Sequence, residues 1–192
     1  MSITIRPPEE QDIEGIFACL RDYRLHPLGD GSTADPDFPA DALLSVRNQI
    51  AEIDLEARCF VGVRDGRILG FCCWGWSDRA ERHAKTVLIS VSESARGLGV
   101  GSLLQHARTD DMWAAGAEEI HTWSDDPRSI AWYKRHFGYR LAGWEPIRHS
   151  LHRFRWRERT WWALHRGFPE RDRLAHLVLA RSAVANQNKE NQ

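Results

Sequence analysis

The stretch SESARGLGVGSLL, residues 92–104, guides the interpretation of the whole sequence. An arginine is followed by Gly97, Gly99 and Gly101 at alternate positions, and apolar residues at helical spacing come next. The N-terminus of a helix carries unpaired N–H groups and a partial positive charge, and glycine lets the backbone come close to a ligand. The stretch therefore predicts an anion site, with a phosphate or pyrophosphate as the expected ligand.

Two common phosphate-binding motifs do not fit this spacing. The P-loop requires G-x-x-x-x-G-K-[ST], and no lysine follows a glycine here in that frame. The dinucleotide fingerprint G-x-G-x-x-G needs a third glycine at position 102, where the chain has Ser102. A glycine-rich helix entry without a ligand stays open as the structural alternative.

The segments around this stretch predict one sheet with helices packed against it. Strands are expected at residues 2–6, 59–63, 68–76, 85–91, 119–123, 139–144 and 151–164. Helices are expected up to about residue 23, over residues 40–53, from the glycine stretch to Gly116, and over residues 128–136 and 169–185. Residues 85–91 are β-branched and apolar, which predicts a central strand buried on both faces. The order of elements indicates an α/β or α+β fold with a mixed sheet.

Composition limits the classes of protein to consider. The 192 residues are 42% hydrophobic and 28% charged, which indicates one globular domain over residues 1–185 and a disordered tail at 186–192. A net charge of -1 argues against nucleic-acid binding. No apolar run has the length of a signal peptide or a membrane span, so we expect a cytoplasmic protein without membrane contact. Four cysteines without a C-x-x-C pair indicate free, buried thiols.

A second motif, DPRSIAWYKRHFGYRLAG, occupies residues 126–143. The first motif, read from Val91 as V-x-x-x-x-R-G-x-G-x-G, resembles the acyl-CoA pyrophosphate loop of the GNAT superfamily of N-acetyltransferases. The second is similar to the GNAT signature N-x-x-[AS]-x-x-[FLW]-Y-x-x-x-G-[FY]. The residues that fit it are Ser129, Trp132, Tyr133, Gly138 and Tyr139. Asp126 stands where asparagine is usual, and one extra residue precedes Gly138.

This resemblance covers roughly residues 3–145, with the two signatures inside residues 85–145. It implies the GNAT fold, a central, mixed, mostly antiparallel sheet flanked by helices, here with a C-terminal helix. It also implies acetyl-CoA as acyl donor, direct attack of an amine on the thioester, and no metal. The implied CoA-binding residues are Ile89, Ser90, Val91, Arg96, Gly97, Leu98, Gly99, Val100, Gly101, Ser102, Asp126 and Ser129. Tyr133 matches the tyrosine that protonates the leaving thiolate in such enzymes, and its alternative role is that of a core tyrosine.

The residues leave the general base open. An ammonium group must lose a proton before it attacks, so a carboxylate or a histidine is expected nearby. The candidates that flank the relevant strands are Glu81, His83, His121, Asp125 and Asp126. Each has a purely structural alternative. We favour His83 and His121 because histidine titrates near neutral pH.

The acceptor is equally open. Trp74 either belongs to the core or lines an acceptor pocket. Arg155 and Arg157 lie in HRFRWRERT, residues 152–160, which either exposes a solvated arginine face or binds an anionic acceptor. We predict acetylation of the primary amine of a small molecule. Two alternatives are acetylation of a protein N-terminus or lysine, and acyl-CoA binding without catalysis. The apolar, tryptophan-rich C-terminal region could also form a homodimer interface.

Overall fold

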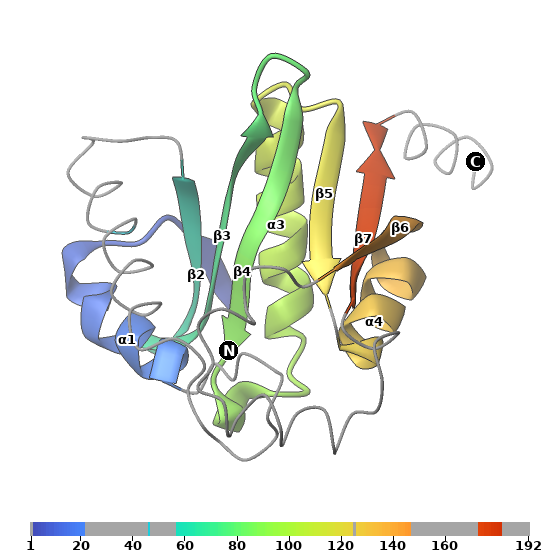
Figure 1. Cartoon of the computed structure of the whole chain (residues 1–192). Helices are drawn as coiled ribbons and strands as arrows, with labels where there is room; N and C mark the ends of the chain where they lie inside the picture. Colours follow the sequence, from blue (N-terminus) through green and yellow to red (C-terminus); the bar gives the residue numbers. More distant parts are fainter. Residues whose placement is uncertain (1, 22–45, 47–56, 125, 147–172, 182–192) are drawn as a thin grey trace, which may run out of the picture.

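The computed structural model describes residues 2–21, 46, 57–124, 126–146 and 173–181 (Figure 1). Its centre is a seven-stranded sheet in the order β1-β2-β3-β4-β5-β7-β6. The strands are β1 (Thr4–Arg6), β2 (Ala57–Arg64), β3 (Arg67–Asp78), β4 (His83–Val91), β5 (Glu119–Ser124), β6 (Arg140–Pro146) and β7 (Arg173–Ala180). The helices are α1 (Ile13–Arg21), α3 (Val100–Ala114) and α4 (Pro127–Phe137), with short 3₁₀ turns η1 (Glu10–Asp12) and η2 (Glu93–Ala95).

Among the described strands only β4 and β5 run parallel, which confirms the predicted mixed, mostly antiparallel sheet. These two strands pair over a short length, from His83 opposite Glu119 to Lys85 opposite His121. Beyond that point β4 stays paired with β3 and β5 stays paired with β7. Residues 86–91 of β4 therefore form a backbone edge inside the sheet that is not paired with β5, although the Thr86 and Thr122 hydroxyls bond at 2.5 Å.

The two faces of the sheet carry different helices, and we call them the α1 face and the α3 face. On the α1 face, Ile16 of α1 packs with Phe71 and Leu88. On the α3 face, Val100 and Leu104 of α3 pack with β3 and β4, and Figure 1 shows α3 behind β4. α3 comes close at Gly70, where a Cβ would lie 3.1 Å from Val100 Cγ1 and 2.9 Å from the Ser90 carbonyl oxygen. This contact fixes the start of α3 against the end of β4.

Two predictions about the sheet are wrong. The helix predicted at residues 169–185 is replaced over residues 173–180 by β7, which lies between β5 and β6. Its buried side chains alternate at Ala175, Leu177 and Leu179. A short apolar run fits the period of a helix as well as that of a strand, and here the hydrogen bonds to neighbouring strands select the strand. The strand predicted at 85–91 is present but not buried on both faces, because Val87 is 50% exposed at a point that no described helix covers.

The other predicted elements within the described residues are present, with ends shifted by a few residues. The four cysteines are buried thiols, as predicted. The elements predicted at 40–53 (apart from residue 46) and 151–164, and the tail at 186–192, lie outside the described residues. Within the part of the chain that is described, no helix is both long and apolar enough to cross a membrane.

Candidate functional site

The glycine stretch forms the tight connection between β4 and α3. Gly97 and Gly99 have φ angles of 80° and 79°, a left-handed conformation that residues with a side chain disfavour. A Cβ at either position would meet no atom within 4 Å among those described, so the outer side of this backbone is bare. The turn therefore combines a glycine-dependent conformation with room for a ligand.

The turn ends at the N-terminus of α3, where backbone N–H groups gather. The first bond within the helix runs from the Leu103 N–H to the Gly99 carbonyl oxygen, at 3.1 Å. The amides of Val100, Gly101 and Ser102 precede that bond, so α3 itself offers them no acceptor. The Arg96 side chain is 56% exposed and lies 3.9 Å from Glu93. These amides, the helix dipole and the guanidinium together can hold an anion.

The predicted pantetheine-binding residues lie on the unpaired half of β4, next to this turn. A Cβ on Gly101 would lie 3.6 Å from Val91 Cγ2 and 3.9 Å from Trp132 Cζ2, so the end of β4, the start of α3 and the middle of α4 meet here. Ile89 and Val91 pack on the α3 face. Ser90 points to the α1 face, where its hydroxyl donates a 2.8 Å hydrogen bond to the Cys19 carbonyl oxygen. The backbone of this segment forms the edge that faces away from β3.

Asp126 and Ser129, also assigned to the cofactor from sequence, bond to each other. Asp126 is the N-cap of α4 and accepts bonds from the Arg128 and Ser129 amides, at 3.2 and 3.1 Å, and from the Ser129 hydroxyl, at 2.8 Å. Burial by itself raises the pKa of Asp126, but these hydrogen bonds outweigh it and the pKa is lowered. Aspartate thus caps the helix as the expected asparagine would.

Tyr133 lies on α4 with its ring in the core of the α3 face. The residue is 6% exposed, and its ring contacts those of Trp132 and Tyr139 at centroid distances of 5.0 and 5.1 Å. Its hydroxyl oxygen accepts a 2.8 Å hydrogen bond from Arg108 Nη2. Within the described residues the hydroxyl hydrogen has no acceptor, so Tyr133 is free to donate it to a bound molecule.

Arg108, on α3, is a site residue that the sequence interpretation missed. It is fully buried and donates to the side-chain oxygen of Gln105 and to the carbonyl oxygens of Cys73, at 3.3 Å, and Leu88, at 2.7 Å. Leu88 lies on the unpaired half of β4, so Arg108 ties Tyr133 to that strand.

The sequence does carry a signal for Arg108. Leu104, Arg108 and Met112 recur at intervals of four along α3, and all three are buried. A charged residue in the middle of an apolar helical stripe needs a polar environment inside the protein.

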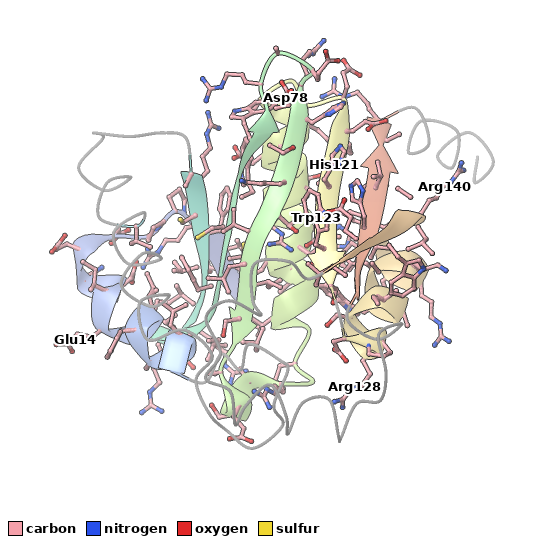
Figure 2. The ribbon with its side chains drawn as sticks, in the orientation of Figure 1. Glu14, Asp78, His121, Trp123, Arg128 and Arg140 are labelled. Carbon is pink, nitrogen blue, oxygen red and sulfur yellow. The ribbon has the colours of Figure 1, made fainter. Side chains whose placement is uncertain are left out.

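The histidines that we favoured as general base, His83 and His121, lie on the α1 face. Ile120 and Thr122 of β5 point to the α3 face, so His121 between them points the opposite way (Figure 2). The His83 and His121 rings lie 4.8 Å apart. Glu119 Oε2 lies 3.3 Å from His121 Nε2 and 3.7 Å from His83 Nε2. The structure therefore brings the two predicted candidates together around one carboxylate.

A third histidine extends this group across the sheet. His121 Nδ1 lies 2.8 Å from His176 Nε2 on β7, and His176 Nδ1 lies 3.3 Å from Glu145 Oε1 on β6. His121 Nε2 is buried and makes no hydrogen bond in the described structure, although Glu119 is close. These contacts join Glu119, His121, His176 and Glu145 into one chain of polar side chains across the neighbouring strands β5, β7 and β6.

The pKa of His121 is lowered. Burial is the main cause, and the neighbouring His176 and His83 lower it further, against the opposing effect of Glu119. His121 is therefore neutral near pH 7 and able to accept a proton. The atoms that His83, Glu119 and His121 offer lie within 4.8 Å of one another, and two imidazoles with a carboxylate are a donor set that suits a zinc ion.

The remaining sequence candidates do not join the site in the described structure. Trp74 is 1% exposed and its indole N–H donates to Asp111 at 2.7 Å, so it makes the contacts of a core residue. Glu81 is exposed, in the turn between β3 and β4. Asp125, Arg155 and Arg157 lie outside the described residues.

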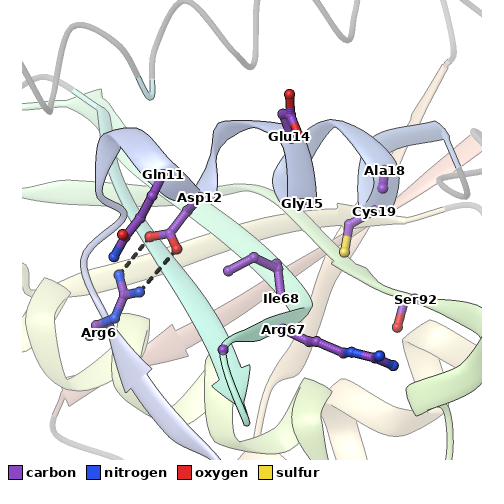
Figure 3. Close-up of a pocket in the computed structure, with 11 residues that line it drawn as sticks. Arg6, Gln11, Asp12, Glu14, Gly15, Ala18, Cys19, Arg67, Ile68 and Ser92 are labelled. Carbon is purple, nitrogen blue, oxygen red and sulfur yellow. Dashed lines mark hydrogen bonds and ion pairs between the residues drawn. The ribbon is translucent and has the colours of Figure 1, made fainter.

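A pocket of about 550 Å³ lies beside α1, and Figure 3 shows the residues that line it. Arg6 donates to both carboxylate oxygens of Asp12, at 2.6 and 3.0 Å, so these two charges compensate each other. Ser92, at the end of β4, lies on its rim, but none of the predicted site residues lines it. The pocket is therefore separate from the residues around Tyr133 and His121.

Comparisons with known proteins concern the family and the fold. A family model described as the acetyltransferase (GNAT) family matches residues 21–139, and no curated protein sequence matches the chain. An N-acetyltransferase from Staphylococcus aureus Mu50 is similar in structure, with a TM-score of 0.65 and 19% identity over 94% of this chain and 99% of that one. A ribosomal-protein-alanine N-acetyltransferase from Brucella melitensis has a TM-score of 0.64 and 14% identity, over 92% and 99%. The yncA protein from Salmonella typhimurium, solved with acetyl-CoA, has a TM-score of 0.66 and 14% identity, over 94% of each chain. At these identities the likeness shows a shared fold.

Proposed function

Because the chain belongs to the acetyltransferase (GNAT) family and is therefore an acyltransferase, we propose that it moves the acetyl group of acetyl-CoA to a primary amine of a small molecule. The observation that supports this most is the position of the Tyr133 hydroxyl. It is tied through Arg108 to the unpaired half of β4 and has a proton to give. That proton is what a departing thiolate requires.

The donor would lie between β4 and β5. The pyrophosphate would meet the amides of Val100, Gly101 and Ser102 and the charge of Arg96. The pantetheine arm carries amide groups, and the backbone edge of residues 86–91 offers them hydrogen-bond partners like those of a neighbouring strand. Gly97 and Gly99 leave the approach to the turn free of side chains.

The acceptor amine would approach from the α1 face, on which His121 lies. His121 has a lowered pKa and is neutral near pH 7, so it can accept a proton, and Glu119 and His176 lie 3.3 and 2.8 Å from its two ring nitrogens. We therefore assign His121 as the general base that takes the proton from the ammonium group, with His83 beside it. The neutral amine then attacks the thioester carbon, and Tyr133 on the opposite face protonates the sulfur.

The surroundings of His121 favour a small acceptor. The Trp123 and His176 rings are stacked at 4.7 Å and within 5° of parallel, which gives a flat aromatic wall on the α1 face. Glu119 and Glu145 stand at the two ends of this group, and their charges attract an ammonium ion. A cytoplasmic location and a homodimer stay predictions.

A screen of acceptors tests the proposal. The full-length protein is incubated with acetyl-CoA and a panel of amino acids, amino sugars, arylalkylamines and peptides, and both CoA thiol release and acetylated product are measured. Turnover of a small amine supports the proposal. Turnover of peptides alone would move the acceptor to proteins, and acetyl-CoA binding without turnover on any member would indicate a binding module.

A further inference from the structure

Arg108 is a buried cation that lacks a carboxylate partner in the described structure. Its residue is 0% exposed, and its partners are the Gln105 side-chain oxygen, the carbonyl oxygens of Cys73 and Leu88, and the Tyr133 hydroxyl. Burial by itself lowers the pKa of Arg108, but attraction to Tyr133 and other neighbours outweighs it and the guanidinium stays charged. A buried charge held only by neutral groups is costly, and such a charge is best stabilised by an anion.

The orientation of the guanidinium shows where that anion would form. One terminal nitrogen is held by the carbonyls of Cys73 in β3 and Leu88 in β4, which are paired opposite each other beside the bulge at Val87. The other terminal nitrogen donates to the Gln105 side-chain oxygen and to Tyr133 Oη, the latter at 2.8 Å. The carbonyl contacts fix the group to the sheet, and the other terminal nitrogen places its charge between a neutral amide and the hydroxyl.

The neighbouring Tyr139 provides a contrast. Its hydroxyl accepts a 3.2 Å hydrogen bond from the amide nitrogen of Gln105, and burial raises its pKa. Arg108 makes its only tyrosine hydrogen bond in the described structure to Tyr133. The two buried tyrosines on this face thus differ in their donor, a neutral amide for one and a guanidinium for the other.

We propose that Arg108 and Tyr133 together form the site for the sulfur anion of CoA, with Arg108 supplying the positive charge. This rests on the proposed function. As the amine–carbon bond forms and the carbon–sulfur bond breaks, the electron pair of the latter goes to sulfur. The Tyr133 O–H gives its proton to sulfur, and the negative charge left on Oη lies 2.8 Å from the guanidinium. The attacking nitrogen loses a second proton as the amide forms, and this proton returns through water to the Tyr133 phenolate. The first proton, which the base took from the ammonium group, passes to solvent, so a neutral amide, the CoA thiol and the Tyr133 O–H remain.

A simpler role for Arg108 is to satisfy the carbonyl oxygens at the β4 bulge. Removing the arginine would disturb both roles, so the decisive variant keeps the guanidinium and its contacts and cancels its charge. Gln105→Glu does this, because it keeps the shape of the side chain and puts a carboxylate at the oxygen that already accepts from Arg108. If Arg108 is purely structural, the new carboxylate gives it an ion pair. If its charge is needed to hold an anion, the new carboxylate neutralises that charge before the anion forms.

The readout is binding of free CoA against acetyl-CoA as a function of pH, by calorimetry. Acetyl-CoA has no ionisable sulfur and serves as the internal control. In the wild type, affinity for CoA relative to acetyl-CoA should rise as the pH approaches the thiol pKa, because the bound thiolate is stabilised. In Gln105→Glu and in Arg108→Met this gain should fall by about tenfold, the equivalent of one pKa unit. Arg108→Lys should restore part of it.

The outcomes separate the two proposals. If the wild type binds neither acetyl-CoA nor CoA, the proposed function fails. If both bind but Gln105→Glu keeps the full pH-dependent gain for CoA, the charge of Arg108 has no role at sulfur and the inference is overturned. Ultraviolet absorbance of the bound thiolate, followed through the same titration, tests whether Arg108 stabilises the thiolate without an affinity measurement. Thermal melting of Gln105→Glu checks that the variant is folded, and turnover does not enter the comparison.

Discussion

Replacing Tyr133 by phenylalanine separates the chemical role of its hydroxyl from the packing of its ring. The ring contacts with Trp132, Phe137 and Tyr139 do not involve the hydroxyl and are retained. The change removes the O–H that is free to donate and the oxygen that accepts from Arg108. We expect a large loss of turnover together with a moderate loss of stability.

Both magnitudes follow from the contacts. Removing a general acid lowers kcat by about 10²–10⁴-fold. Removing a hydrogen bond to a charged group costs about 1.5–3 kcal/mol. At about 2–4 °C per kcal/mol for a chain of this size, the melting temperature of Tyr133→Phe should fall by roughly 3–12 °C. The affinity for acetyl-CoA should stay near that of the wild type, because the hydroxyl acts after the donor is bound.

Tyr139→Phe is the matched control. It removes a hydroxyl from the same core, but one that accepts from the neutral Gln105 amide at 3.2 Å, so about 1 kcal/mol of stability is lost and kcat stays close to wild type. Turnover is measured by thiol release at saturating acetyl-CoA and amine, well below both melting temperatures. A Tyr133→Phe enzyme with wild-type kcat, or an equal loss in both variants, would refute the assignment of Tyr133 as the acid.

Three further predictions concern the other parts of the site. Gly99→Ala should cost about 1–2 kcal/mol through its left-handed backbone and should also weaken acetyl-CoA binding in calorimetry; Gly66→Ala, with a φ of 72° and equally open surroundings, should show the strain alone, and equal binding in both would count against the turn as the donor site. Asp126→Ala should cost about 1 kcal/mol at pH 7 in urea unfolding, and Asp126→Asn less. Because the pKa of Asp126 is lowered in the folded state, its contribution is present above the unfolded-state pKa and is lost as the pH falls through the folded-state pKa, so a cost that persists in strong acid would contradict the capping role. Turnover should survive dialysis against a chelator, as expected for a reaction without a metal, and a loss that zinc restores in the wild type but not in His83→Ala would assign a metal to His83, Glu119 and His121.

Part of the proposed site has local signals in the sequence. The glycines at 97 and 99 occupy left-handed positions in a turn a few residues long, and the helix that follows supplies amides whatever the rest of the fold does. The motif that proposes Tyr133 lies within one helix and the turn that ends it. Such features depend on the conformation of neighbouring residues, which the sequence records directly.

The failures of prediction concern contacts between distant segments. Residues 173–180 could be a helix or a strand by their apolar spacing, and the open hydrogen-bonding edges of β5 and β6 selected the strand. The role of Arg108 depends on the packing of α3 against β3 and β4, which brings the guanidinium to Tyr133, 25 residues away in the sequence. No local pattern encodes that contact.

The sequence by itself determined the fold family, the order of elements up to β6 and the glycine turn before α3, since these follow from backbone preferences over short spans. The tertiary structure decided how the chemical groups are paired. It placed His121, His83 and His176 on one face and Arg108 with Tyr133 on the other, on either side of the point where β4 and β5 separate. A side chain's charge, proton and partner depend on what surrounds it in space, and in this protein those surroundings come from strands and helices far apart in the chain.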